Sequence, residues 1–210
     1  MELYFSPLAC SMATRIALYE AGADATFIEV DPITHATLDG TPLASITPLA
    51  LVPAIRTDEG DTLVENAAVL QYVAARHPEV GLAPTDARGR ALLQQWLCFV
   101  GTELHKAVFA ALLDPHAPEG AKSYALSKVP ARFELLEKHL AGRDFLLDRF
   151  TVADAYLVTV LNWTIATPID LAKWPAVAAY LSRHRQRPSV ARALAIELPL
   201  YQAEQKRHAA

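Results

Sequence analysis

The stretch MELYFSPLACSMATRIALYEA, residues 1–21, decides how the amino-terminal half of the chain is interpreted. Residues 2–6 alternate and are rich in aromatic side chains, which predicts a short strand that ends at Pro7. Residues 11–21 have helical spacing. Cys10 is therefore expected at the first turn of a helix that follows directly after a strand.

The pattern beyond this opening continues as a mixed α/β unit. Further strands are expected at residues 26–30, 52–56 and 62–64, and a second helix at residues 65–76. Residues 31–47 show no regular pattern. The first eighty residues thus follow the order β-α-β, loop, β-β-α.

The rest of the chain shows helical spacing and no convincing strand. Helices are expected within residues 92–108, 126–140, 152–165 and 175–185. Pro130 should kink or restart the second of these, because proline removes a backbone donor. We therefore expect three parts: an α/β domain at residues 1–79, a linker at 80–86 and an all-helical domain at 87–210.

Composition narrows the class of protein. The chain has 210 residues, of which 52% are hydrophobic and 20% charged, and its net charge is −4. A nucleic-acid-binding protein usually carries a clustered basic surplus, so none is expected as a partner. Neither an apolar run of about 18 residues nor a signal-peptide profile is present, so we expect a cytoplasmic protein without membrane association.

The two cysteines, Cys10 and Cys98, are isolated from other cysteines, so neither a structural disulfide nor a metal site is expected. Cys98 lies in an apolar stretch, where an inert thiol is the usual case. At Cys10, unpaired N–H groups and the helix dipole would stabilise a thiolate, although burial would oppose this. We expect Cys10 to be the reactive thiol.

Two further positions could bind a peptide-like ligand. Val52 and Pro53 open a strand: an ordinary edge-strand proline is the simpler interpretation, whereas a cis bond would turn the Val52 backbone outward for strand-like pairing. Asn66 is a suitable N-cap for the helix after Glu65, and that helix end could bind a carboxylate while Glu65 accepts from an ammonium group. A well-capped helix without a ligand is the equal alternative.

The long helix after the linker carries Cys98 and His105 seven residues apart, which would place them on one face, about 10 Å apart along the axis. A structural or surface role is the commoner one for such a histidine. Thr151 and Asp154 match a capping box before an apolar run, which we interpret as a folding feature without catalytic content.

Five segments in order resemble the bacterial beta class of cytosolic glutathione transferases, over nearly the whole chain. They are MELYFSPLACS at residues 1–11, TPLALVPA at 47–54, ENAAVLQY at 65–72, WLCFVGTELHK at 96–106 and FTVADAY at 150–156. The resemblance implies a thioredoxin-like α/β domain followed by an all-α domain. It also implies a homodimer.

The same resemblance implies a function: conjugation of glutathione, as co-substrate and without another cofactor or a metal, to small hydrophobic electrophiles. Glutathione would pair with the Val52 backbone at the cis-proline loop, with its γ-glutamyl end at Glu65 and Asn66. Its sulfur would come to Cys10 and His105, which are the implied catalytic residues. Cys10 could also form a mixed disulfide with glutathione.

Some family positions differ in this chain. His35 stands where the family commonly has a lysine for the glycyl carboxylate of glutathione, and Cys98 stands where it has an asparagine. Leu49-Ala50-Leu51 replaces a polar stretch of the cis-proline loop. A ligand-binding or regulatory protein on the same scaffold is therefore the alternative to an enzyme.

Overall fold

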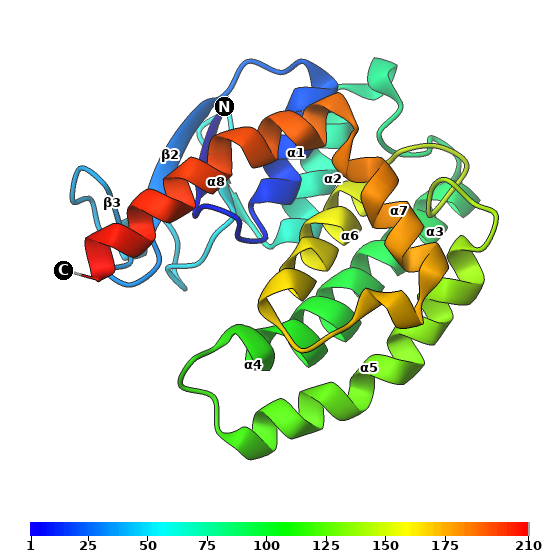
Figure 1. Cartoon of the computed structure of the whole chain (residues 1–210). Helices are drawn as coiled ribbons and strands as arrows, with labels where there is room; N and C mark the ends of the chain where they lie inside the picture. Colours follow the sequence, from blue (N-terminus) through cyan, green and yellow to red (C-terminus); the bar gives the residue numbers. More distant parts are fainter. Residues whose placement is uncertain (210) are drawn as a thin grey trace. The chain divides into compact units, whose positions relative to one another are not determined.

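The computed structural model of the chain describes residues 1–209, and these form two units (Figure 1). One unit combines Met1–Leu82 with the chain from Pro188 onward, and the other is Ala83–Arg187. The boundary after Leu82 lies inside the linker expected at residues 80–86. The end of the chain differs from the expected division, because its last helix packs against the first unit and not within the second.

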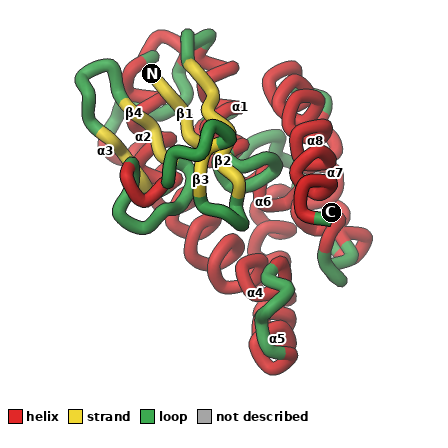
Figure 2. The backbone as a smooth tube through the Cα atoms, turned by 90° about the vertical axis from the view of Figure 1, so that its left-hand side faces the viewer, coloured by secondary structure: helices red, strands yellow, loops and turns green. Residues whose placement is uncertain are grey.

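The first unit is built on a five-stranded mixed sheet in the order β3-β2-β1-β4-β5, most of which can be followed in Figure 2. Its strands are β1 (Glu2–Phe5), β2 (Thr26–Asp31), β3 (Ala36–Thr37), β4 (Ala54–Arg56) and β5 (Thr62–Val64). The central strand β1 runs parallel to β2, with Glu2 opposite Thr26, and antiparallel to β4. The short strand β3 and a 3₁₀ turn at Leu43–Ser45 lie in the stretch that was expected to be irregular.

Three α-helices belong to the first unit: α1 (Met12–Ala21), α2 (Asn66–Arg76) and α8 (Pro188–His208). The helix α1 connects the parallel strands β1 and β2 and packs against both α2 and α8. With neighbours on several sides, seven successive residues of α1, from Met12 to Leu18, are buried. The helix whose amino end follows Cys10 is therefore firmly fixed in the unit.

Helix α8 was not predicted from the sequence. Its buried residues include the polar side chains Ser189, Glu197 and Glu204 next to Val190 and Ala193. A search for apolar residues at helical spacing does not register a face on which three of the five buried residues are polar.

A small apolar cluster positions the loop before β4. Tyr4, Val30 and Ala54, from three neighbouring strands, pack with Leu43. The loop residues Ile46, Ala50 and Val52 are partly buried against this cluster. Part of the apolar character of residues 49–51 is therefore explained by packing, whereas the side chains of Leu49 and Leu51 themselves are exposed.

The second unit is helical in all its regular elements between residues 83 and 187. They are α3 (Ala87–Cys98), the π-helix η3 (Phe99–Phe109), α4 (Ala110–Leu113), α5 (Glu119–Leu140), α6 (Val152–Asn162), the 3₁₀ helices η4 (Trp163–Ala166) and η5 (Leu171–Lys173), and α7 (Pro175–Arg185). The helix α6 forms the centre, since Val152 to Leu161 are all buried and α3, η3 and α7 pack around it. The hydrophobic core of this unit surrounds one helix.

Two details of the helical unit correct the sequence expectations. Helix α5 runs through Pro130 without interruption, so the helix does not restart there. Pro130 lies on an exposed face, where water can replace the missing backbone donor. The helix expected at residues 152–165 is α-helical only to Asn162, and a 3₁₀ turn completes it.

The combined helical run Ala87–Leu113 is long and apolar enough to cross a membrane by length and composition alone. A core helix of a soluble protein passes the same test. Here the run packs against α5 and α6 within its unit, and 33% of its apolar window is buried.

Candidate functional site

Cys10 lies in the turn between β1 and α1, one residue before the helix cap at Ser11. Its half-buried thiol donates to the carbonyl oxygen of Val52, with 3.3 Å between sulfur and oxygen. Its own carbonyl oxygen accepts from the side-chain amide of Asn66 at 3.2 Å and from the backbone N–H of Ala13 at 3.1 Å. The structure thus places the thiol at the amino end of a helix, where the helix dipole favours a thiolate.

The peptide bond between Val52 and Pro53 is cis. The residues alone favoured an ordinary edge-strand proline, and the structure corrects this in the direction that the family resemblance implies. Strand β4 begins only at Ala54, so Val52 belongs to the preceding loop and not to the strand. Its carbonyl oxygen faces the Cys10 thiol, which brings these two predicted site residues into contact.

Glu65, and not Asn66, occupies the cap position of α2. Glu65 is exposed and has a left-handed backbone with φ of 67°. Asn66 is the first residue of the helix and is buried; its amide oxygen accepts from the Thr14 hydroxyl at 3.3 Å while its NH₂ group holds the Cys10 carbonyl. The prediction of Asn66 as N-cap was therefore wrong: its side chain connects α2 to the Cys10 turn.

His35 lies on a separate, exposed turn after β2. Its backbone is left-handed, with φ of 51°, its N–H donates to the Asp31 carbonyl, and its carbonyl accepts from Leu43. The turn is braced further by the Asp31 carboxylate, which accepts from the N–H groups of Ile33 and Thr34. These bonds fix the backbone of the turn and leave the imidazole at the surface.

His105 belongs to the helical unit, on the π-helix η3. Its Nδ1 lies 2.8 Å from the Tyr156 hydroxyl, and its ring packs edge-to-face against Trp163. Burial, helped by the neighbouring Lys106 charge, lowers the pKa of His105 from 6.5 to about 4. The imidazole is therefore uncharged at neutral pH, and the hydroxyl of Tyr156 fixes its orientation.

Cys98 is exposed at the end of α3, where its sulfur accepts from the Gln94 amide at 3.3 Å. The expectation that Cys98 and His105 share one face assumed a continuous α-helix, but a π-helix begins at Phe99. Its wider turns change the angular spacing on which the expectation depended.

Two buried charged residues beside the Cys10 turn were not predicted. Glu197 of α8 accepts from the backbone N–H of Leu8 and from the guanidinium of Arg15, and both charged side chains are buried. No motif or periodicity marks them, and only the position of α8 in three dimensions brings them together.

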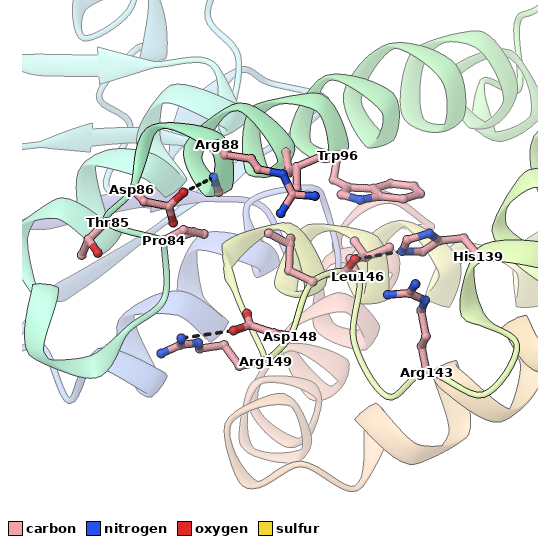
Figure 3. Close-up of a pocket in the computed structure, with 13 residues that line it drawn as sticks. Pro84, Thr85, Asp86, Arg88, Trp96, His139, Arg143, Leu146, Asp148 and Arg149 are labelled. Atoms are coloured by element: carbon pink, nitrogen blue, oxygen red, sulfur yellow. Dashed lines mark hydrogen bonds and ion pairs between the residues drawn. The ribbon is translucent and has the colours of Figure 1, made fainter.

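A hollow of about 540 Å³ lies in the helical unit, between the start of α3 and the turn after α5 (Figure 3). The charged side chains of Arg88 and Arg143 line it together with Trp96 and His139, whose Nε2 donates to the Leu146 carbonyl. Neither Cys98 nor His105 lines this hollow. Its charged rim does not match the apolar site that the resemblance implies for an electrophile.

Among the residues that the structure describes, no group of three or more His, Cys, Asp or Glu side chains could hold a metal ion. What the sheet unit does bring together is a thiol at a helix start, a cis-proline loop and the amino end of a second helix. These features define the class of thioredoxin-like, thiol-handling proteins, here joined to a helical unit.

Comparison with known proteins makes the assignment specific. The model of the glutathione S-transferase N-terminal domain matches residues 2–81, and that of the C-terminal domain matches residues 96–188. The chain belongs to the glutathione S-transferase family. It is an enzyme of this kind, and glutathione is its co-substrate.

Three relatives illustrate the similarity. Glutathione S-transferase GstA of Escherichia coli O157:H7 is 35% identical over 199 residues, which cover 94% of this chain and 98% of the relative. A sphingomonad glutathione S-transferase solved in complex with glutathione is 42% identical, with a TM-score of 0.89 and coverage of 94% and 98%. The bacterial beta class enzyme of Sphingomonas chungbukensis is 39% identical, with the same TM-score and coverage.

Proposed function

We propose that this glutathione transferase joins glutathione to small hydrophobic electrophiles, with Cys10 as the protein group at the reacting sulfur. The observation that carries the proposal is the contact between the Cys10 thiol and the Val52 carbonyl beside the cis-proline. A tripeptide paired in strand fashion with the Val52 backbone would present its own sulfur next to Cys10.

The remaining predicted residues have separate tasks in this proposal. The γ-glutamyl end of glutathione would bind at the amino end of α2, with its carboxylate on the helix N–H groups and its ammonium at the exposed Glu65 carboxylate. Asn66 supports this arrangement indirectly, through its bond to the Cys10 carbonyl. His35 would meet the glycyl carboxylate.

The residues of the helical unit enter the proposal through the family resemblance. His105 is the second proposed catalytic group, and its uncharged ring, oriented by Tyr156, could accept or donate a proton. Cys98 stands where the family has an amide that contacts glutathione, and it is exposed. The electrophile would bind on apolar side chains of this unit.

A second reaction follows from the same thiol. With glutathione disulfide as the oxidant, the Cys10 thiolate would attack one of its sulfurs, form a mixed disulfide with Cys10 and release one glutathione thiolate. The Cys10 sulfur is oxidised and the released glutathione is reduced, so the step balances.

The test compares wild type with Cys10→Ala after incubation with glutathione disulfide. Intact-protein mass spectrometry should show one glutathione adduct on the wild type, located on Cys10, and none on the variant. Cys98→Ala serves as the matched control and should still form the adduct. An adduct found only on Cys98 would overturn the assignment of Cys10.

Conjugation is tested by the rate of product formation from glutathione and a chromogenic aryl halide. Cys10→Ala should lower kcat/KM, and a value equal to wild type would remove Cys10 from the conjugation step. We also propose a cytoplasmic C₂ homodimer, the commonest symmetric assembly. Light scattering that gave the mass of a single chain at micromolar concentration would contradict the dimer.

A further inference from the structure

The turn that carries Cys10 needs support from outside its own residues. Leu8, two residues before Cys10, has a left-handed backbone with φ of 58°. This conformation is unfavourable for a residue with a side chain, so neighbouring groups must hold it in place. Within the turn, the Ser11 hydroxyl links both ends by bonds to the N–H and C=O of Ser6.

The support for Leu8 comes from α8, almost two hundred residues later in the chain. One carboxylate oxygen of Glu197 accepts from the Leu8 N–H at 2.7 Å. The other accepts from Arg15 Nε at 2.6 Å. One carboxylate therefore joins the turn before Cys10 to the helix after it.

Arg15 is itself held on several sides. Its guanidinium carbon lies 4.2 Å from the centre of the Phe5 ring and 4.0 Å from that of Phe27, and Nη1 donates to the Tyr19 hydroxyl at 3.1 Å. These contacts fix the cation on β1, α1 and β2, so the bond to Glu197 has a rigid anchor.

From this geometry we propose that Glu197 is a positioning residue for Cys10, whose carboxylate holds the Leu8 turn against α1 so that the thiol stays at the amino end of the helix. The inference rests on the proposed role of Cys10 and deepens it. Glu197 acts through Leu8 and Arg15, so it is not itself a catalytic residue.

Several charged groups act on this carboxylate. Burial raises the pKa of Glu197 to about 7, against the opposing effects of Arg15 and the Leu8 N–H, while Glu29 on β2 adds to the increase. Tyr19 on α1 also acts on the Glu197 carboxylate indirectly, because its hydroxyl accepts a hydrogen bond from Arg15. The positioning contact should therefore weaken as the carboxyl group becomes protonated below neutral pH.

The experiment measures the alkylation rate of Cys10 by iodoacetamide in wild type and Glu197→Gln, from about pH 5 to about pH 9, where thiols titrate. Mass spectrometry of tryptic peptides separates Cys10, in the peptide ending at Arg15, from Cys98, in the peptide ending at Lys106. Cys98 thus serves as an internal control in the same molecule.

Glu197→Gln keeps the shape of the side chain but has only one oxygen acceptor for its two donors. A displaced turn moves the thiol from the helix end, so the Cys10 rate at neutral pH should fall at least about threefold and the profile should move to higher pH. Removal of a negative charge alone would do the reverse and move the profile to lower pH. The direction of the change therefore separates positioning from simple electrostatics.

Glu204→Gln is the matched control, because Glu204 is the other buried glutamate of α8 and makes no bond to the Cys10 turn. It should leave the Cys10 profile unchanged. If Glu197→Gln does not fold, Glu197→Asp carries the same expectation in a milder form, since it keeps the charge but has a shorter reach.

An unchanged Cys10 profile, or a shift to lower pH, in a folded Glu197 variant overturns the inference. The readout is thiol reactivity and not turnover, so its result is distinct from that of the proposed function. If Cys10→Ala conjugated glutathione at the wild-type rate, the catalytic assignment would fail while the alkylation result would still decide the role of Glu197.

Discussion

His105 and Asp154 show at the scale of single residues how the helical unit treats buried polar groups. Each lies against the core and each is bonded to a tyrosine, His105 to Tyr156 and Asp154 to Tyr180. The histidine avoids the cost of a buried charge by staying neutral, whereas the carboxylate is surrounded by donors. Different measurements test the two cases.

For His105, the prediction concerns pH. Its pKa in the folded protein is about 4, below the ordinary 6.5, so the unfolded chain binds the proton first as the pH falls. Stability is unaffected by this group above about pH 6.5 and declines toward about pH 4, by roughly 3 kcal/mol in total for a difference of 2.5 pH units. An NMR titration of the imidazole should find it neutral at pH 5.5, and a midpoint near 6.5 would contradict the burial argument.

His105→Gln is the companion variant. Glutamine keeps an acceptor and a donor for the Tyr156 hydroxyl but does not titrate. The free energy of unfolding, measured by denaturant titration at several pH values, should lose this part of its dependence on pH.

For Asp154, the prediction concerns stability. Its carboxylate accepts from the N–H of Leu146 at 2.8 Å, from the N–H and the hydroxyl of Thr151 at 2.9 Å each, and from the Tyr180 hydroxyl at 2.8 Å. Asp154→Ala leaves several buried donors without an acceptor, so the free energy of unfolding should fall by about 3 kcal/mol or more. The capping box predicted from the sequence is present, and it is one part of this larger network.

Asp148→Ala is the control for that variant. Asp148 is exposed and pairs with the exposed Arg149, so its loss should cost less than about 1 kcal/mol. Equal denaturation midpoints for the two variants would show that the Asp154 network contributes no more than a surface ion pair.

At the scale of elements, the helical run from Ala87 to Leu113 contains two glycines with opposite surroundings. A methyl group on Gly101 would meet only the Tyr156 ring, at 3.6–3.7 Å, which is ordinary contact. A methyl group on Gly89 would collide with Pro84 and lie 2.7 Å from an Asp86 carboxylate oxygen. The same substitution should therefore have opposite effects on stability.

Gly101→Ala should raise the free energy of unfolding by up to about 1 kcal/mol, because alanine favours a helix interior. Gly89→Ala should lower it, because the turn that leads into α3 must move. Thermal melts of the two variants check this, and a lower melting temperature for Gly101→Ala would show that the π-helix at that point requires glycine.

The elements also show what the sequence could predict. The strands and helices expected within residues 1–80 are present in the expected order. They could be predicted because residues such as Pro7 and Gly22 mark where an element ends, and because the apolar residues follow a simple period. The cis bond before Pro53 and the π-helical form of η3 depend on tertiary packing, which a local sequence pattern does not show. Helix α8 was missed because its buried face includes Glu197 and Glu204.

In the candidate site, too, some features could be predicted from the sequence and others could not. Cys10, Val52 and Asn66 could be named from the sequence because a strand end, a proline loop and a helix start are local signals. Their bonds could not be predicted: Asn66 was expected to cap its own helix and instead holds the Cys10 carbonyl.

At the scale of the whole molecule, the first unit is completed by the end of the chain. A chain that stops after Arg187 loses Glu197, and with it the acceptor of the buried Arg15 guanidinium. The truncation also uncovers the surface of α1 against which α8 packs, so this truncated chain should appear mainly in the insoluble fraction. A chain that stops after His208 keeps all of α8 and should remain in the soluble fraction. Equal solubility of the two truncations would contradict the role given to α8.

The return of α8 to the first unit also fixes an order of events during synthesis. Domains usually fold as they leave the ribosome, the amino-terminal one first. Here residues 1–82 emerge early but wait for a helix that is translated after the whole of the second unit, which can fold in the meantime. Termination of translation before α8, or proteolytic removal of α8, would thus disable the unit that carries Cys10, although that unit is itself translated much earlier. A chain can therefore hold its Cys10 turn in place only after Glu197 has been translated.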